Sequence, residues 1–136
     1  MQSKLYAEGF KAISKVAWPY ISFQNDIPLV VLIDDDKFTR LNWDIFCKSN
    51  SISFRSFRNI DEFLLNDIGF DPNVHIFLDS NLGENVKGET ESEKIAKLGF
   101  VNLYLATGYE KESIVRPSWI VKVFSKKPEN ILKVLN

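Results

Sequence analysis

Acidic side chains follow two separate aliphatic runs of the sequence. Asp34, Asp35 and Asp36 come directly after one run, and Asp79 comes directly after another. Two carboxylates about 4 Å apart repel by about 4 kcal/mol at an effective dielectric constant near 20, so such a group calls for a cation. Oxygen ligands with room for water suit Mg²⁺. The pattern predicts a magnesium site, provided that both runs end at the same place.

A hydroxyl group and two lysines follow two further apolar runs of the sequence. Thr107 ends one of them, and Lys126 and Lys127 come shortly after the other. Phosphoryl transfer needs its spread-out negative charge neutralised and little covalent help from the protein. A metal, a lysine and a hydroxyl are therefore the parts of a phosphoryl site, and Gly108 leaves space beside the hydroxyl. This chemistry requires no catalytic base.

The runs that carry these residues have the character of buried strands. Strands are predicted at 29–33, 52–57, 74–78, 101–106 and 120–124. Helices are predicted at 41–46, 60–68 with Asn59 as a cap, 89–98, 110–116 and 131–135. Alternating strands and helices predict an α/β fold with a five-stranded parallel sheet and helices on both faces. Ligands of such sheets bind beyond the carboxyl ends of the strands, where the polar residues lie.

A helical arm is predicted before the sheet. Four apolar side chains recur there at helical spacing: Tyr6, Phe10, Ile13 and Ala17. Pro19 ends the pattern. We therefore expect a helical arm or linker at 1–27 and one domain at 28–136. The apolar stripe indicates a docking face, either for this domain, for a second copy or for a neighbouring segment.

Composition limits the classes of function. The 136 residues suit one domain, and 45% hydrophobic with 26% charged residues exclude disorder and fibrous repeats. A net charge of −1 argues against an electrostatically driven nucleic-acid or membrane-surface binder. The single cysteine, Cys47, is expected to be a small core residue and indicates a reducing, cytoplasmic compartment. No apolar run approaches the ~20 residues of a membrane-spanning helix.

Four motifs in this order resemble the receiver domains of two-component response regulators and hybrid histidine kinases. They are LIDDD (32–36), IFLDSNLG (76–83), LATG (105–108) and FSKKP (124–128). The resemblance covers about residues 28–135 and not the N-terminal arm. It implies a flavodoxin-like (βα)5 fold. It also implies a phosphoacceptor domain in a phosphorelay, with no catalytic activity beyond its own phosphoryl transfer.

The resemblance implies roles for individual residues at the first two motifs. Asp79 would accept a phosphoryl group from a histidine kinase or a phosphotransfer protein in a reaction that needs Mg²⁺. Asp35 would ligate the metal directly, Asp79 would be a further ligand, Asn81 would supply its backbone carbonyl, and Asp34 would act mainly through water. The chain would then be a stand-alone receiver or a segment of a hybrid histidine kinase.

In the last two motifs, the resemblance implies residues that contact the phosphoryl group and a residue that changes conformation on phosphorylation. Thr107 would bind a phosphoryl oxygen and move inward, and a lysine would pair with another oxygen. The Lys-Pro step and the spacing from Phe124 favour Lys127 over Lys126. Phe124 stands where the family often carries a rotating aromatic residue. The stretch 108–119 and the last helix are short for surfaces that family members use to pair, so a homodimer is left open.

Two other classes of protein fit parts of the pattern. A haloacid-dehalogenase-like phosphatase would use Asp34 as nucleophile and Asp36 as acid or base, but Phe38 stands where that family has threonine or valine, and Asp79 would have no role. A pseudo-receiver would act only through protein contact. For two single residues a structural role is favoured: Asp36 as a surface or helix-capping residue, and His75, which starts a strand.

Overall fold

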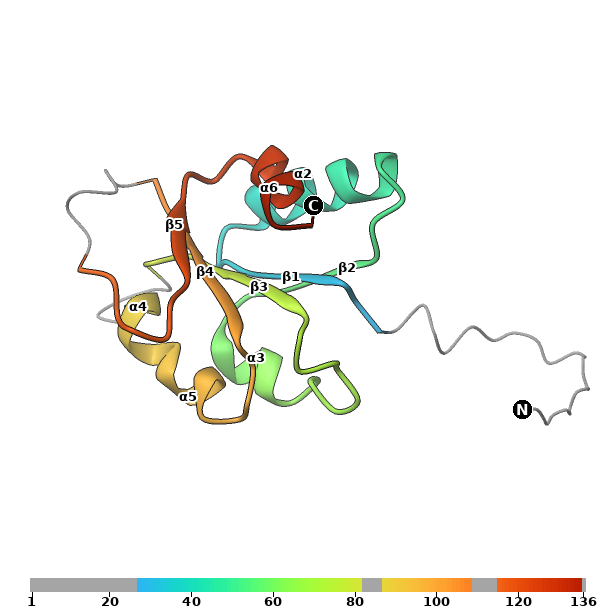
Figure 1. Ribbon diagram of the computed structural model, residues 1–136. Helices are drawn as coiled ribbons and strands as arrows, with labels where there is room; N and C mark the ends of the chain where they lie inside the picture. The colour runs from blue at the N-terminus through green and yellow to red at the C-terminus, as the bar shows by residue number, and fades with distance from the viewer. Residues whose placement is uncertain (1–26, 82–86, 109–114, 136) are drawn as a thin grey trace, which may run out of the picture.

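The computed structural model describes residues 27–81, 87–108 and 115–135, and its strands form one sheet. The strands are β1 (Val30–Ile33), β2 (Phe54–Phe57), β3 (His75–Leu78), β4 (Asn102–Ala106) and β5 (Lys122–Phe124). All neighbouring pairs are parallel, in the order β2-β1-β3-β4-β5 (Figure 1). This order is that of the flavodoxin-like folds, so the predicted fold class is confirmed.

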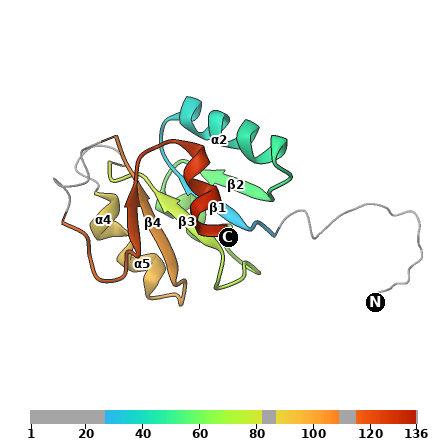
Figure 2. The same ribbon diagram turned by 45° about the horizontal axis from the view of Figure 1, so that its top comes forward.

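Helices cover both faces of the sheet. They are α2 (Lys37–Ser49), α3 (Ile60–Leu64), α4 (Gly88–Glu91), α5 (Glu93–Ala96), the 3-10 helix η3 (Pro128–Ile131) and α6 (Leu132–Leu135). α2 and α6 lie on one face, and α3, α4 and α5 lie on the other (Figures 1 and 2). None of the helices in the three described ranges is both long enough and apolar enough to cross a bilayer.

β1 is buried on both faces because its side chains alternate between two apolar clusters. Val31 and Ile33 belong to the cluster beneath α3 and α5, and Val30 and Leu32 belong to the cluster beneath α2 and η3. Cys47 of α2 lies in the second cluster with no exposed surface, which confirms that it is a core residue. A central strand of this kind must be aliphatic throughout, which explains the run before the three aspartates.

Two helices end earlier than their sequence pattern predicts. α3 stops at Leu64, and the Asn66 side chain donates to the Glu62 carbonyl at 2.7 Å. In a continuing helix this carbonyl would accept the Asn66 backbone N–H, so the side chain takes the place of the next helical hydrogen bond. The predicted helix at 89–98 is divided into α4 and α5 at Ser92, whose hydroxyl donates to the Glu89 carbonyl at 2.9 Å. The predicted Asn59 cap of α3 is confirmed, since its side chain accepts from the Glu62 N–H.

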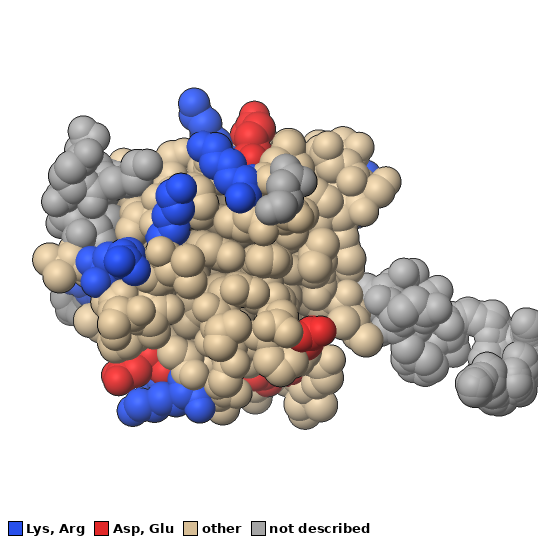
Figure 3. Space-filling view, viewed as in Figure 1, with Lys and Arg blue, Asp and Glu red and all other residues tan. Residues whose placement is uncertain are grey.

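Surface charge is mixed rather than of one sign. On the face shown in Figure 3, basic side chains gather over the region of β5 and α6, and acidic side chains lie at the top and along the lower edge. Acidic and basic side chains adjoin one another at the top and at the lower left of this view, so the low net charge reflects both signs interspersed on the surface (Figure 3). The predicted helices at 6–17 and 110–116 lie wholly or mainly outside the described residues, and the boundary at 27/28 stays a prediction.

Candidate metal centre

Three carboxylates meet at the carboxyl-terminal edge of the sheet. Asp34 follows β1 and Asp79 follows β3, and these neighbouring strands pair in register up to Ile33 and Leu78. Oxygens from the carboxylates of Asp34, Asp35 and Asp79 all lie within 4.8 Å of one another. The two aliphatic runs therefore end at the same place, as the sequence predicted.

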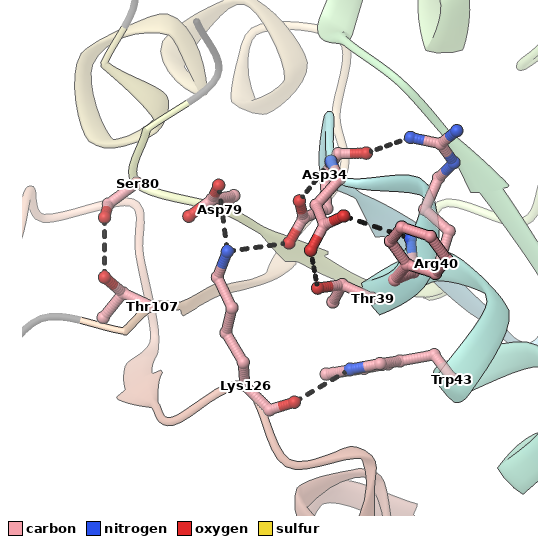
Figure 4. Close-up of polar contacts among 10 residues, drawn as sticks. Asp34, Thr39, Arg40, Trp43, Asp79, Ser80, Thr107 and Lys126 are labelled. Carbon is pink, nitrogen blue, oxygen red and sulfur yellow. Dashed lines mark hydrogen bonds and ion pairs between the residues drawn. The ribbon is translucent and has the colours of Figure 1, made fainter.

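Asp34 is a fully buried carboxylate. Its Oδ1 accepts the Asp36 backbone N–H at 2.9 Å, and its carbonyl accepts from Arg40 Nη1 at 2.7 Å (Figure 4). Its Oδ2 lies 3.1 Å from Lys126 Nζ and makes no well-directed hydrogen bond within the described residues. Burial raises the pKa of Asp34, although the Asp36 N–H and the Lys126 charge act against it. Asp34 Oδ2 is therefore an oxygen that a cation could use.

Asp79 is the second buried carboxylate, with 4% of its surface exposed. Its backbone N–H donates to the Ile33 carbonyl at 2.9 Å, and its Oδ2 lies 3.2 Å from Lys126 Nζ. Burial, followed by the nearby charge of Asp34, raises the pKa of Asp79 to about 6, against the opposing effect of Lys126. Asp79 is consequently mostly ionised at pH 7 and becomes protonated below about pH 6.

Lys126 is the lysine that reaches these carboxylates. Its Nζ lies 3.1 Å from Asp34 Oδ2 and 3.2 Å from Asp79 Oδ2. Partial burial lowers the pKa of Lys126, but the two carboxylates outweigh that effect and raise it. Lys127 is exposed and caps η3 just before Pro128. The sequence prediction that favoured Lys127 at this position is therefore corrected to Lys126.

Trp43 explains which lysine points inward. Its indole Nε1–H donates to the Lys126 carbonyl at 3.0 Å, and its ring is fully buried on α2. This bond holds the backbone so that the Lys126 side chain extends over the sheet edge (Figure 4). Lys127 lines a groove of about 550 Å³ between α2 and η3, which Lys126 also borders, and it does not line the pocket at the carboxylates.

Asp35 and Asp36 have different roles although they are adjacent. Asp36 is the N-cap of α2, and its carboxylate accepts the Thr39 hydroxyl at 2.9 Å and the Phe38 N–H at 3.1 Å. These hydrogen bonds, with that of Thr39 the largest, lower the pKa of Asp36. Asp36 is thus a capping residue, as predicted. Asp35 is exposed and joins the carboxylate group.

A pocket of about 420 Å³ opens at this edge of the sheet. Its lining residues are Asp35, Asp79, Asn81, Gly108 and Lys126. Asn81 and Gly108 therefore border the same space as the carboxylates and the lysine. The pocket combines negative and positive groups within one small volume, which suits a metal together with an anionic ligand.

Thr107 lies close by but does not line the pocket. It follows β4, is 1% exposed, and its Oγ1 lies 2.7 Å from Ser80 Oγ. Ser80 is itself 5% exposed. The sequence singled out Thr107 and gave no role to Ser80, whose partner is 27 positions away in the chain.

Phe124, the predicted switch residue, is buried at the end of β5. Its ring centroid lies 5.8 Å from those of Phe77 and Tyr104. The ring is 3% exposed and belongs to the cluster beneath α2 and η3. Rotation of Phe124 stays a prediction. His75 is also structural in this arrangement, since its Nδ1 lies 2.9 Å from the Tyr104 hydroxyl, away from the carboxylates.

Gly88 is a site residue that the sequence did not indicate. It begins α4, and its N–H donates to the Ser80 carbonyl at 3.0 Å. A Cβ at this position would lie 1.9 Å from the Asp79 carbonyl oxygen. Only glycine allows α4 to rest directly on the backbone of Asp79. A glycine before a helix is too common a pattern to reveal this close approach.

The donor set fits a divalent metal ion. Asp34, Asp35 and Asp79 offer carboxylate oxygens, and Lys126 supplies one positive charge against them, which leaves two negative charges without compensation. Two of the carboxylates are buried and one is exposed, so water can share the coordination. The cluster could therefore hold a metal ion.

Loss of Lys126 is expected to destabilise the fold at neutral pH. In Lys126→Met, Asp34 and Asp79 would face each other without a counter-charge, so we expect the free energy of unfolding to fall by about 1–3 kcal/mol at pH 7. The loss should shrink near pH 5, where Asp79 is protonated. Urea denaturation at pH 7 and at pH 5 measures this change in the free energy of unfolding. Lys127→Met is the matched control, and an equal loss in both variants would contradict the assignment.

Comparisons of the chain with protein-family models, with curated proteins and with solved structures find no match. The function must therefore be argued from the site itself.

Proposed function

We propose that the chain is a Mg²⁺-dependent phosphoacceptor domain. In this proposal Asp79 receives a phosphoryl group from a histidine kinase or a phosphotransfer protein, and the modification changes the conformation and the partners of the domain. The observation that carries the proposal is the setting of Asp79. It is a buried carboxylate on a pocket that Asp35 also lines, with Lys126 Nζ 3.2 Å from its Oδ2.

The residues present can perform each part of this reaction. A carboxylate oxygen of Asp79 would form the new bond to phosphorus while the bond from phosphorus to the donor nitrogen breaks and its electron pair returns to the imidazole. Lys126 would pair with a phosphoryl oxygen, since its ammonium group already faces Asp79. No base is needed because Asp79 is mostly ionised at pH 7. Phosphorylation would add about −1.5 to −2 charges at this edge.

Mg²⁺ is the metal that this donor set favours. Asp35 and Asp79 would hold it with their carboxylates, Asp34 would act mainly through water, and Asn81 would add its backbone carbonyl. A bound Mg²⁺ neutralises charge on the phosphoryl oxygens. The cluster contains oxygen ligands and no sulfur or imidazole among the described residues, which disfavours zinc and softer metals.

The competing interpretations fit the geometry less well. A haloacid-dehalogenase-like phosphatase would need Asp36 free at the pocket, but Asp36 caps α2 through Thr39 and Phe38. A pseudo-receiver would have no use for buried acidic groups that cost stability. Neither alternative gives Asp79 a role that matches its burial and its place on the pocket.

The direct test is incubation of the full chain with acetyl phosphate, followed by intact mass measurement. We expect the addition of one phosphoryl group with Mg²⁺ present and none after chelation with EDTA. Hydroxylamine should remove the group, because an acyl phosphate is labile to it. A folded sample that gains no mass would overturn the proposal, and repeated turnover of a simple phosphate ester would favour the phosphatase.

Mg²⁺ affinity is expected to depend on pH. Asp79 binds a proton with a pKa of about 6, so protons compete with the cation below that value. The apparent dissociation constant should be nearly constant above pH 7 and should rise by up to about tenfold per pH unit below pH 6. Isothermal titration calorimetry between pH 5 and pH 8 measures this.

The matched control for the pH series is Asp71→Asn. Asp71 lies before β3, at the opposite edge of the sheet, where its carboxylate accepts the Asn73 N–H. This variant should reproduce the wild-type profile. An affinity that does not change between pH 5 and pH 8 would show that Asp79 takes no part in holding the ion.

A further inference from the structure

Ser80 and Thr107 form a buried pair of hydroxyl groups beside the pocket. Their oxygens are 2.7 Å apart, and the two residues are 5% and 1% exposed. Figure 4 shows the pair to one side of Asp79, while the Asp79 carboxylate points toward Lys126. The bond joins the residue after Asp79 to the end of β4, so it links the two strand ends on which the proposed reaction depends.

Neither hydroxyl residue lines the pocket. The lining consists of Asp35, Asp79, Asn81, Gly108 and Lys126. Thr107 therefore stands next to the pocket, between Gly108 and β4, with its hydroxyl directed at Ser80. In the proposal that follows, the Thr107 side chain gives up this bond when its hydroxyl turns toward a ligand bound at Asp79.

We propose that Ser80 is a positioning residue that holds Thr107 out of the pocket until a phosphoryl group competes for the Thr107 hydroxyl. This inference rests on the proposed function. A threonine hydroxyl has a single proton to donate. A bond to an anionic phosphoryl oxygen is charge-assisted and stronger than one to a neutral hydroxyl, so the exchange is favourable but opposed by the lost Ser80 contact. Ser80 thus sets how readily the domain switches.

A purely structural pair would behave differently. If the two hydroxyl groups only joined β3 to β4, removal of Ser80 would lower stability and leave ligand affinity unchanged. If Ser80 holds Thr107 back, its removal strengthens binding of a phosphoryl mimic even where it weakens the fold. Affinity therefore separates the two roles.

The experiment titrates the full chain with beryllofluoride in the presence of Mg²⁺. Ser80→Ala should bind about three- to tenfold more tightly than the wild type, the range that one neutral hydrogen bond supplies. In a Thr107→Val background, Ser80→Ala should change the affinity by less than about twofold, because the contact no longer exists. Ser53→Ala is the matched control, since its hydroxyl also makes one bond, to the Ile27 carbonyl at 3.0 Å.

A second measurement on the wild type does not depend on any variant folding. Nuclear Overhauser contacts between the side chains of Ser80 and Thr107 should be present with Mg²⁺ alone and should be lost on addition of beryllofluoride. Contacts that persist, or a Ser80→Ala affinity that is unchanged or weaker, would overturn this inference alone. A wild-type protein that binds no beryllofluoride would overturn the proposed function and this inference with it.

Discussion

Asp79→Asn is expected to lose phosphoryl acceptance completely and, without Mg²⁺, to be more stable than the wild type at pH 7. The loss follows because the amide has no nucleophilic carboxylate oxygen. The gain follows from the raised pKa of Asp79, about 6 in the folded state against about 3.9 in an unfolded chain. A carboxyl whose pKa is raised by folding binds its proton more tightly in the native state, so stability falls as pH rises from about 4 to about 6.

The size of the gain follows from the same shift. Each pKa unit corresponds to 1.36 kcal/mol, and Asp79 is almost fully buried, so we expect Asp79→Asn to gain about 1–3 kcal/mol at pH 7. The difference should shrink to about 1 kcal/mol or less at pH 4.5 and should vanish only below about pH 4, where the carboxyl is protonated in the unfolded chain as well. Added Mg²⁺ should stabilise the wild type and not the variant.

Urea denaturation at the two pH values measures the effect, and intact mass after acetyl phosphate treatment measures the lost acceptance. Asp71→Asn serves as the control, since it removes a carboxylate at the opposite edge of the sheet. An Asp79→Asn protein that is less stable than the wild type at pH 7, or a gain that is equal at both pH values, would contradict the electrostatic account of the site.

Gly88→Ala is expected to cause the largest loss of stability. An added Cβ would lie 1.9 Å from the carbonyl oxygen of Asp79 and 2.9 Å from its carbonyl carbon. These are backbone atoms at the end of β3, so they cannot swing aside as a flexible side chain would. Relief requires α4 to move away, which breaks the hydrogen bond from the Gly88 N–H to the Ser80 carbonyl. We expect a loss of about 3 kcal/mol, at the upper end for overpacking.

Gly108→Ala is the matched control for Gly88→Ala. No heavy atom lies within 4 Å of the position that its Cβ would take. This variant should unfold at nearly the wild-type urea concentration, whereas Gly88→Ala should unfold earlier and bind Mg²⁺ more weakly. Equal stability of the two alanine variants would mean that α4 does not rest on Asp79.

The sequence predicted the sheet and the acidic group because both depend on local patterns. A short aliphatic run rich in β-branched residues, such as that of β1, is typical of a buried strand, and parallel strands bring the residues that follow them to one edge. Asp34, Asp35 and Asp79 therefore met as expected. The ends of α3 and α4 were harder to predict, since they depend on side-chain bonds of Asn66 and Ser92 that compete with the helix.

The neighbouring residues in the sequence do not show which of the two lysines faces the carboxylates. Lys126 and Lys127 are identical in chemistry, and what separates them is the bond from the Trp43 indole to the Lys126 carbonyl, across 83 positions of the chain. Ser80 and Gly88 were missed for a similar reason. Ser80 acquires its role from the contact between the ends of β3 and β4, and Gly88 acquires its role from the contact between β3 and α4. The spacing of residues in the sequence reveals neither contact.

The hydrogen bond from Trp43 to Lys126 allows tryptophan fluorescence to report on ligand binding at the acidic site. A ligand that draws the Lys126 ammonium away from Asp34 changes the charge around the residue whose carbonyl accepts the indole N–H. Indole emission is sensitive to the loss of such a bond and to changes in nearby charge. Occupation of the acidic edge can thus be followed through intrinsic emission, and a chain in which Trp43 is replaced by Phe separates its signal from that of the other two tryptophans.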